Sequence, residues 1–398
     1  MTRTPLALAA IASAAVPGLD PVNVKGVIHR PGHQFEVAFV QDTQDRRWVV
    51  RAPMTAAAAA QMDVAVSLLG LLSRRLPFSV PMPKGFVALD EGVRAVVYPF
   101  IAGRPLAFAQ LPGGPGIAAD LGRALAALHN LDLALCEEAG LTAYDPDTYR
   151  TRRLADLDRA AATGKVPTGL LSRWERSLED VSLWRFAPTP IHGDLNGSEV
   201  LAVFADDSDA ATGRVRGLTG WENAKVADPA DDFATLVTQA SPAAFDSVLE
   251  AYAHARLDRP DKYLERRARL AGELKALSKL LTAVGSGDKS SVATCADRLR
   301  KLDEATFDTV DAAPVVPTLP AGRDTTGSFA FTPHNNKASE GQQFSGAPNA
   351  TKAPRAAENA DVSGPRDEDE PDGQDRAVEV VVGLDDPRAA APESSDGP

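Results

Sequence analysis

Two short segments of this 398-residue chain hold carboxylates at spacings that could do chemistry. Residues 191–201 read IHGDLNGSEVL, and residues 217–233 read GLTGWENAKVADPADDF. A carboxylate can orient a hydroxyl group for attack, and as a hard oxygen ligand it can bind Mg²⁺. Phosphoryl transfer requires these two functions and little covalent chemistry from the protein. We therefore expect the chemistry of this chain in these two segments.

Together the two segments resemble the catalytic centre of the aminoglycoside- and macrolide-phosphotransferase family of kinases. In that family the first segment usually runs HGDLxxxN and the second I-D-W…DPxxD. The separation between Asp194 and Gly220 also matches that between the catalytic and metal loops of the family. The resemblance implies a protein-kinase-like fold, and transfer of the γ-phosphoryl group of ATP or GTP, with Mg²⁺, to a hydroxyl of an antibiotic-like or metabolite alcohol.

The resemblance makes Asp194 the catalytic carboxylate, but both metal-binding positions depart from the family pattern. Glu199 stands where the family has Asn, and Gly220 stands where it has the metal-binding Asp. Glycine has no side-chain oxygen, so Gly220 cannot coordinate Mg²⁺. Glu199 and Glu222 are the candidates for a rebuilt metal site, since both offer hard oxygen ligands. The alternative is that both are solvated loop carboxylates.

The resemblance assigns structural roles to His192, which would bond backbone groups of its loop, and to Asp228, which would bond backbone amides and cap a helix starting near Pro229. On the nucleotide side, Arg51 replaces the usual strand lysine. Arginine pairs well with phosphate, so Arg51 is the candidate nucleotide-binding residue. Its alternative is a solvated strand position, because the helix residue that would orient it is Ala65 rather than Glu.

Two functions stay open at this point. The first is an active small-molecule kinase, and the second is a catalytically inactive pseudokinase that acts as a binding or scaffold module. Glu199, Gly220, Ala65 and the sparse glycines of residues 24–35 favour weak or lost activity, since a phosphate-binding loop needs several glycines. The retained HGDL and DPADD motifs favour a function at the site. We expect a phosphotransferase with impaired activity.

The elements that must position these segments are those of a two-lobed α+β fold. Hydrophobic patterns predict three strands over residues 23–53, a helix over 55–76, and a strand hairpin over 85–101 that ends in a hinge. Helices dominate beyond it, including three closing helices over 243–256, 260–284 and 288–302. We predict an antiparallel-sheet N-lobe over residues 1–101 and a mainly helical C-lobe over residues 102–312.

The composition changes sharply at the C-terminal end. Residues 313–398 contain 15 Asp and Glu against 7 Lys and Arg, so they carry −8 of the net charge of −12. Such a polar segment cannot bury enough apolar surface to offset its ordering entropy, and we predict a disordered acidic tail. One apolar stretch, VEVVVGL at 378–384, is either a short interaction segment that recruits a protein partner or a chance cluster.

Several classes of protein are excluded by composition. The negative charge argues against a nucleic-acid partner, and no apolar run reaches the roughly 18 residues of a membrane span. Cys136 and Cys295 are too few for a disulfide framework or a zinc site, which fits a cytoplasmic protein. The Ala-rich segment 1–20 resembles a short secretory signal, but its weak hydrophobicity favours an N-terminal helix.

Truncation after Ala313 is expected to leave the domain folded. The removed residues are polar and contain few aromatics, so they contribute almost nothing to a core. The Tm of the truncated protein, measured by calorimetry, should lie within a few degrees of that of the full chain. A loss of soluble expression on deleting residues 320–398 would show instead that the tail packs on the domain.

Overall fold

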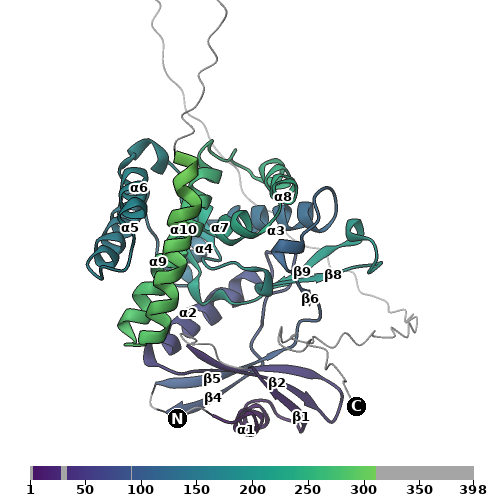
Figure 1. Ribbon diagram of the computed structural model, residues 1–398. Helices are drawn as coiled ribbons and strands as arrows, with labels where there is room; N and C mark the ends of the chain where they lie inside the picture. Colours follow the sequence, from purple (N-terminus) through teal and green to yellow (C-terminus); the bar gives the residue numbers. More distant parts are fainter. Residues whose placement is uncertain (1–2, 28–33, 91, 311–398) are drawn as a thin grey trace, which may run out of the picture. The chain divides into compact units, whose positions relative to one another are not determined.

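The computed structural model describes residues 3–27, 34–90 and 92–310, and Met1–Ala313 forms one compact unit (Figure 1). The predicted disorder of residues 313–398 and the apolar stretch at 378–384 lie outside the described residues. The observed architecture is α+β, with an antiparallel sheet in the N-terminal part and helices in most of the remainder. The exact lobe boundaries at 101 and 312 stay predictions.

The N-terminal part is built on a five-stranded antiparallel sheet. In spatial order its strands are β1 Pro21–Gly26, β2 Phe35–Asp42, β3 Arg47–Pro53, β5 Val93–Pro99 and β4 Gly85–Asp90. Helix α1 Pro5–Ala15 covers one face, where Leu8 and Ala12 pack with Val50. Because side chains alternate along a strand, Arg51 points to the opposite face of the sheet.

Helix α1 occupies the segment for which a helix rather than a signal sequence was expected. Thr4 caps it by accepting a hydrogen bond from the Ala7 amide at 3.2 Å, and Leu8 and Ala12 are buried. Within the ranges that the structure describes, no helix combines the length and apolar character needed to cross a membrane.

Helix α2 Ala56–Leu72 lies between the sheet and the helices that follow (Figure 1). Its Met62 and Leu68 share one core with Val96 of the sheet and with Leu121 of helix α3 Ile117–His129. This continuous core ties the strand that carries Arg51 to the helices that carry the catalytic segment.

The C-terminal part contains eight α-helices and two small sheets among the described residues. The helices are α3 Ile117–His129, α4 Leu133–Glu138, α5 Pro146–Ala161, α6 Thr168–Glu179, α7 Ala230–Gln239, α8 Pro242–Ala255, α9 Leu264–Gly285 and α10 Lys289–Val310. The sheets pair β7 Thr189–Ile191 with β10 Lys225–Ala227, and β8 Val200–Val203 with both β6 Arg104–Pro105 and β9 Arg214–Leu218. The closing helix expected to end at residue 302 continues to Val310.

Helix α9 joins two cores of the C-terminal part. Its first turns contribute Leu264 and Ala268 to the core around α3, α7 and α8. Its later turns contribute Leu274 and Leu277 to a second core formed with α5, α6 and α10, in which Leu170 is fully buried. Side chains on the remaining faces of α9 are therefore held in fixed positions beside α7.

Leu170→Ala is expected to lower the free energy of unfolding by about 2–5 kcal/mol, because it leaves a cavity in the second core. Leu257→Ala is a matched control, since Leu257 is 82% exposed and its loss should change stability little. Urea denaturation of the two variants measures the difference. Equal effects would contradict the packing described for α5, α6, α9 and α10.

Candidate functional site

A buried carboxylate holds the backbone of the segment that contains Asp194. Asp232 on α7 accepts hydrogen bonds from the amides of His192 and Gly193, both at 2.8 Å. Gly193 has a positive φ of 86°, and a Cβ there would lie 2.1 Å from the Asn223 carbonyl oxygen, so this position requires glycine. The loop that follows β7 therefore has one well-defined path.

Asp232 is in turn held by a buried network from two other helices. The Nε2 atom of His129 on α3 lies 3.0 Å from Asp232, and its Nδ1 atom lies 2.9 Å from the hydroxyl of Tyr252 on α8. Burial opposes ionisation of Asp232, but hydrogen bonds from His129 and from the Gly193 amide contribute to lowering the pKa of Asp232. Helices α3, α7 and α8 thus fix the loop together. Sequence reasoning missed His129 and Asp232, although the DPxxD spacing was a signal for the latter.

His192 connects the two segments, 191–201 and 217–233, that carry the family resemblance. Its buried ring donates from Nε2 to the carbonyl oxygen of Thr219 at 2.6 Å, and it packs against Trp221 with the ring centroids 5.0 Å apart. The ring therefore joins the loop after β7 to the loop after β9. This geometry fits the structural role expected for His192, which stays a prediction.

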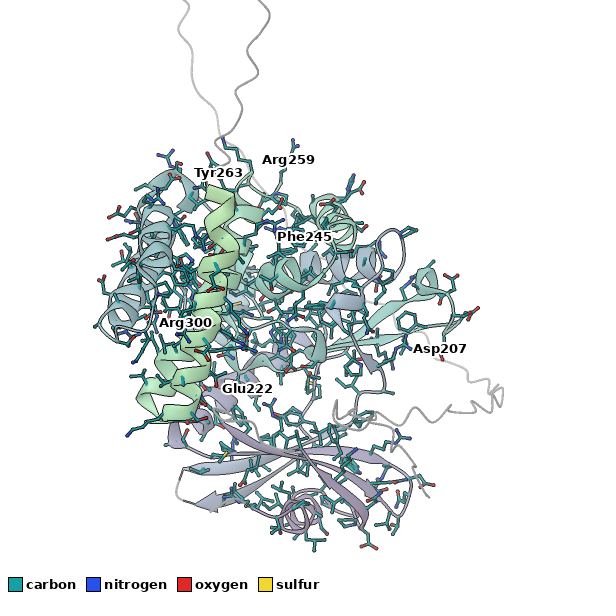
Figure 2. All side chains as sticks on the ribbon, in the orientation of Figure 1. Asp207, Glu222, Phe245, Arg259, Tyr263 and Arg300 are labelled. Carbon is teal, nitrogen blue, oxygen red and sulfur yellow. The ribbon has the colours of Figure 1, made fainter. Side chains whose placement is uncertain are left out.

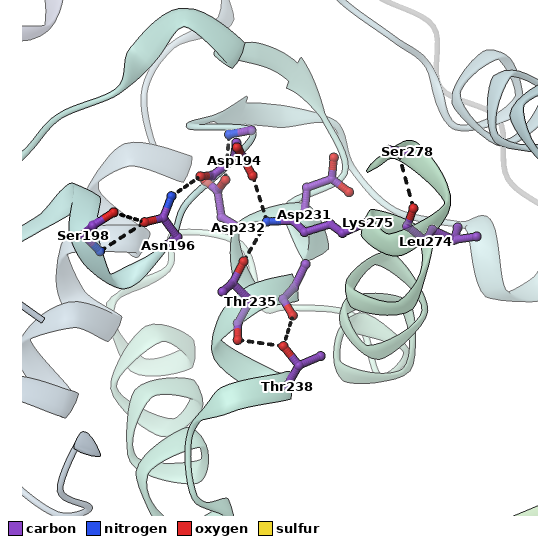
Figure 3. A network of polar contacts seen from close by, with 12 residues as sticks. Asp194, Asn196, Ser198, Asp231, Asp232, Thr235, Thr238, Leu274, Lys275 and Ser278 are labelled. Carbon is purple, nitrogen blue, oxygen red and sulfur yellow. Dashed lines mark hydrogen bonds and ion pairs between the residues drawn. The ribbon is translucent and has the colours of Figure 1, made fainter. Parts of the chain in front are cut away.

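The Asp194 side chain is more than half exposed and is bound by a lysine. Its Oδ1 atom accepts from Nζ of Lys275 on α9 at 3.0 Å, and the same ammonium donates to Oγ1 of Thr235 on α7 at 2.7 Å (Figure 3). The backbone carbonyl oxygen of Asp194 accepts from Nδ2 of the Asn196 side chain at 3.3 Å. No local sequence pattern indicated Lys275, because it lies 81 residues away from Asp194.

The two positions that depart from the family pattern, Glu199 and Gly220, are complementary in space. Gly220 precedes the short 3-10 helix Trp221–Asn223 and has a positive φ of 80°. A Cβ on Gly220 would lie 2.5 Å from Oε2 of Glu199, which also accepts from the Thr219 hydroxyl at 2.6 Å. The carboxylate of Glu199 therefore occupies the space into which a side chain at position 220 would begin to project.

Glu222 is bound across the molecule to Arg51. Glu222 is labelled in Figure 2. Its Oε1 atom lies 2.5 Å from Nη1 of Arg51, and both side chains are mostly buried. The guanidinium group of Arg51 also lies over the ring of Phe35, 4.7 Å from its centroid. Arg51 is thus not a solvated strand residue. Ala65 of α2 is buried and offers no charge, so the arginine pairs with the loop that follows Gly220 rather than with this helix.

Asp228 lies at the start of α7. Its Oδ1 atom accepts from the Ala230 amide at 3.0 Å, and its Oδ2 atom accepts from Nε of the buried Arg267 at 2.7 Å. Burial raises the pKa of Asp228 to about 6, although the charge of Arg267 acts in the opposite direction. These contacts fit the capping role expected for Asp228, and its assignment stays a prediction.

The fit of Mg²⁺ to this site depends on Glu199. Among residues 3–27, 34–90 and 92–310, no group of three or more His, Cys, Asp or Glu side chains is arranged to hold a metal ion. Mg²⁺ commonly uses only one or two carboxylates and completes its coordination with phosphates and water. In the same ranges Glu199 has no basic partner, whereas Glu222 is paired with Arg51. Glu199 therefore fits one such ligand.

Comparison with known proteins places the chain in a family. Residues 27–270 match the phosphotransferase enzyme family known as APH, and the chain belongs to it. It is 26% identical over 236 residues to the uncharacterized protein YcbJ of Bacillus subtilis, covering 56% of this chain and 72% of that protein.

Solved structures of the family share the fold. A macrolide 2′-phosphotransferase, MphH from Brachybacterium faecium, is 25% identical with a TM-score of 0.62, covering 74% of this chain and 98% of that one. A type I macrolide 2′-phosphotransferase is 26% identical with a TM-score of 0.61, covering 75% and 99%. An aminoglycoside phosphotransferase determined with GDP and kanamycin is 19% identical, with a TM-score of 0.62 and coverage of 75% and 98%. The predicted kinase-like α+β fold is confirmed.

Gly220→Asp alone is expected to lower the free energy of unfolding. The positive φ costs about 1–3 kcal/mol for a residue other than glycine, and the new side chain also meets the carboxylate of Glu199. Combining it with Glu199→Asn should recover part of the loss. Urea denaturation of the single and double variants measures both effects.

Gly18→Asp is the matched control, because Gly18 has a φ of 77° and no atom within 4 Å of an added Cβ. It isolates the backbone strain from the collision with Glu199. Should Gly220→Asp be no less stable than Gly18→Asp, the overlap described for positions 199 and 220 is wrong.

Proposed function

We propose that this protein is a phosphotransferase of low activity that moves the γ-phosphoryl group of ATP or GTP to a hydroxyl of a small molecule. The observation that carries this proposal is the carboxylate of Glu199, which fills the space beside Gly220 and has no basic partner in the described ranges. A carboxylate is thus kept at the metal loop although the loop's own Asp is lost. Because such a kinase needs ATP or GTP, the proposal also places the protein in the cytoplasm.

Asp194 is the group that acts on the acceptor. Its Oδ1 atom is bound by Lys275, so Oδ2 is left to accept a hydrogen bond from the acceptor hydroxyl. The hydroxyl oxygen attacks the γ-phosphorus, its proton passes to Asp194, and the bond from that phosphorus to the bridging oxygen breaks to release ADP or GDP. The exposed position of Asp194 allows an acceptor to approach it.

Glu199 would hold the metal, which would supply positive charge beside the phosphates. One protein carboxylate in place of an Asn and an Asp provides a weaker site, which is the reason for the low activity proposed. On the nucleotide side Arg51 can contact phosphate only by sharing its guanidinium group with Glu222. The relatives support a nucleotide ligand, since solved structures of aminoglycoside phosphotransferases contain GDP, ADP or ATP.

A specific observation favours a second candidate function, that of a pseudokinase. The ion pair between Arg51 and Glu222 satisfies the only nucleotide-side cation that sequence reasoning identified, and α2 offers no carboxylate at Ala65 to replace Glu222 as its partner. In that case the fold serves as a binding or scaffold module, and the acidic tail is the segment proposed to recruit a protein partner.

Mg²⁺ dependence distinguishes the two candidates. A thermal shift with ATP or GTP should increase when Mg²⁺ is added, since a ligand at a hundred times its Kd stabilises the folded state by about 2.7 kcal/mol. Glu199→Gln should remove the Mg²⁺-dependent part of the shift, while the matched Glu222→Gln should keep it. Asp194→Asn should keep the shift but lower nucleotide turnover by about 100-fold or more.

The opposite pattern would establish the pseudokinase instead. It consists of a nucleotide shift that is equal with and without Mg²⁺, together with no turnover in the unsubstituted protein. Loss of the Mg²⁺ effect in Glu222→Gln but not in Glu199→Gln would show that Glu222 binds the metal and that the proposed role of Glu199 is wrong.

A further inference from the structure

The ammonium group of Lys275 lies directly beside the acceptor-binding side of the site. It is 3.0 Å from Oδ1 of Asp194 and 2.7 Å from Oγ1 of Thr235, and its side chain is 29% exposed (Figure 3). An ammonium group has three N–H donors. These two contacts use two of them, and one donor is left for a third acceptor.

A carboxylate on α7, Asp231, is also paired with basic side chains. Asp231 lies one helical turn before Thr235, so the two residues are on the same face of α7. Its oxygens lie 3.1 Å from Nη2 of Arg153 and 3.3 Å from Nζ of Lys225, and it also bonds Tyr149. Burial opposes ionisation of Asp231, but the charges of Arg153 and Lys225 outweigh it and lower its pKa. On α9, Glu273 is likewise held 2.6 Å from Arg173.

The charge around Asp194 is therefore unsuited to a polycation. Lys275 compensates the charge of Asp194, and Arg153 and Lys225 compensate the charge of Asp231. An acceptor with several ammonium groups needs carboxylates that are not already compensated, and like charges placed side by side oppose binding. Its ammonium groups would also lie within a few Å of Lys275.

We propose that Lys275 is a specificity-determining residue that excludes polycationic acceptors, and that the acceptor is an alcohol whose hydroxyl has no neighbouring ammonium groups. Lys275 also acts as a positioning residue, since it fixes Oδ1 of Asp194 and leaves Oδ2 for the hydroxyl. The inference rests on the proposed function only in taking the acceptor to bind next to Asp194. Exclusion of polycations can be measured by binding alone, without turnover.

Kanamycin is a suitable polycationic probe, because a related aminoglycoside phosphotransferase was determined with it. Calorimetry should detect no kanamycin binding, or very weak binding, to the unsubstituted protein. Lys275→Met removes the charge and keeps the length of the side chain, and it should strengthen kanamycin binding by about tenfold or more. Lys275→Arg should restore the exclusion.

Lys279→Met is the matched control, because Lys279 is an exposed residue one turn further along α9. It changes the net charge of the helix by the same amount without touching Asp194, and kanamycin should stay excluded. Tight kanamycin binding to the unsubstituted protein, or the same response to both Met variants, would overturn the proposal. So would failure of Lys275→Met to bind kanamycin when its unfolding curve shows a folded protein.

The kinetic measurement separates this inference from the proposed function. In Lys275→Met, kcat for nucleotide turnover should fall by up to about 100-fold while the KM for nucleotide stays constant, because Asp194 is misplaced. Lys275→Arg should recover most of kcat. A change in the KM for nucleotide with kcat unchanged would contradict the positioning role. An unsubstituted protein without turnover refutes the proposed function, while the kanamycin arms still decide the exclusion.

Discussion

The buried carboxylate of Asp232 bonds two consecutive amides of the loop that carries Asp194, and most of the site depends on this contact. A carboxylate out of water is stable only when its oxygens are satisfied, and here His129 and the two amides supply the partners. The same requirement fixes α3, α7 and α8 relative to the loop. Asp194 can therefore project into solvent from a rigid backbone.

At Gly220, where the family pattern has an Asp, the carboxylate of Glu199 occupies the adjacent space instead. Position 220 has no side chain, and position 199 has one long enough to enter the same space. Glycine permits the left-handed backbone at 220, and the Thr219 hydroxyl holds the displaced carboxylate. Each change alone would leave a collision or an empty space, so the two departures from the family pattern are best understood as one rearrangement.

The fold could be predicted from the sequence, because hydrophobic periodicity indicates its elements and two local motifs carry the family resemblance. The succession of strands and one helix expected before residue 101, and the family, are confirmed. The sequence was not sufficient for the relations between side chains. Lys275 meets Asp194 across 81 residues, and His129 meets Asp232 across 103, so no local spacing encodes either contact. The end expected at residue 302 was wrong: no glycine or proline interrupts residues 301–310, and α10 continues to Val310.

Charge compensation links these features to the question of what the site can bind. Asp194, Asp228 and Glu222 each have a basic partner, as does Asp231, whereas Glu199 has only a hydroxyl donor in the described ranges. A site with one uncompensated carboxylate has room for one small hard cation and little attraction for a polyamine. Because that carboxylate lies beside Gly220, the remaining negative charge is placed next to the loop after β9 rather than next to Lys275.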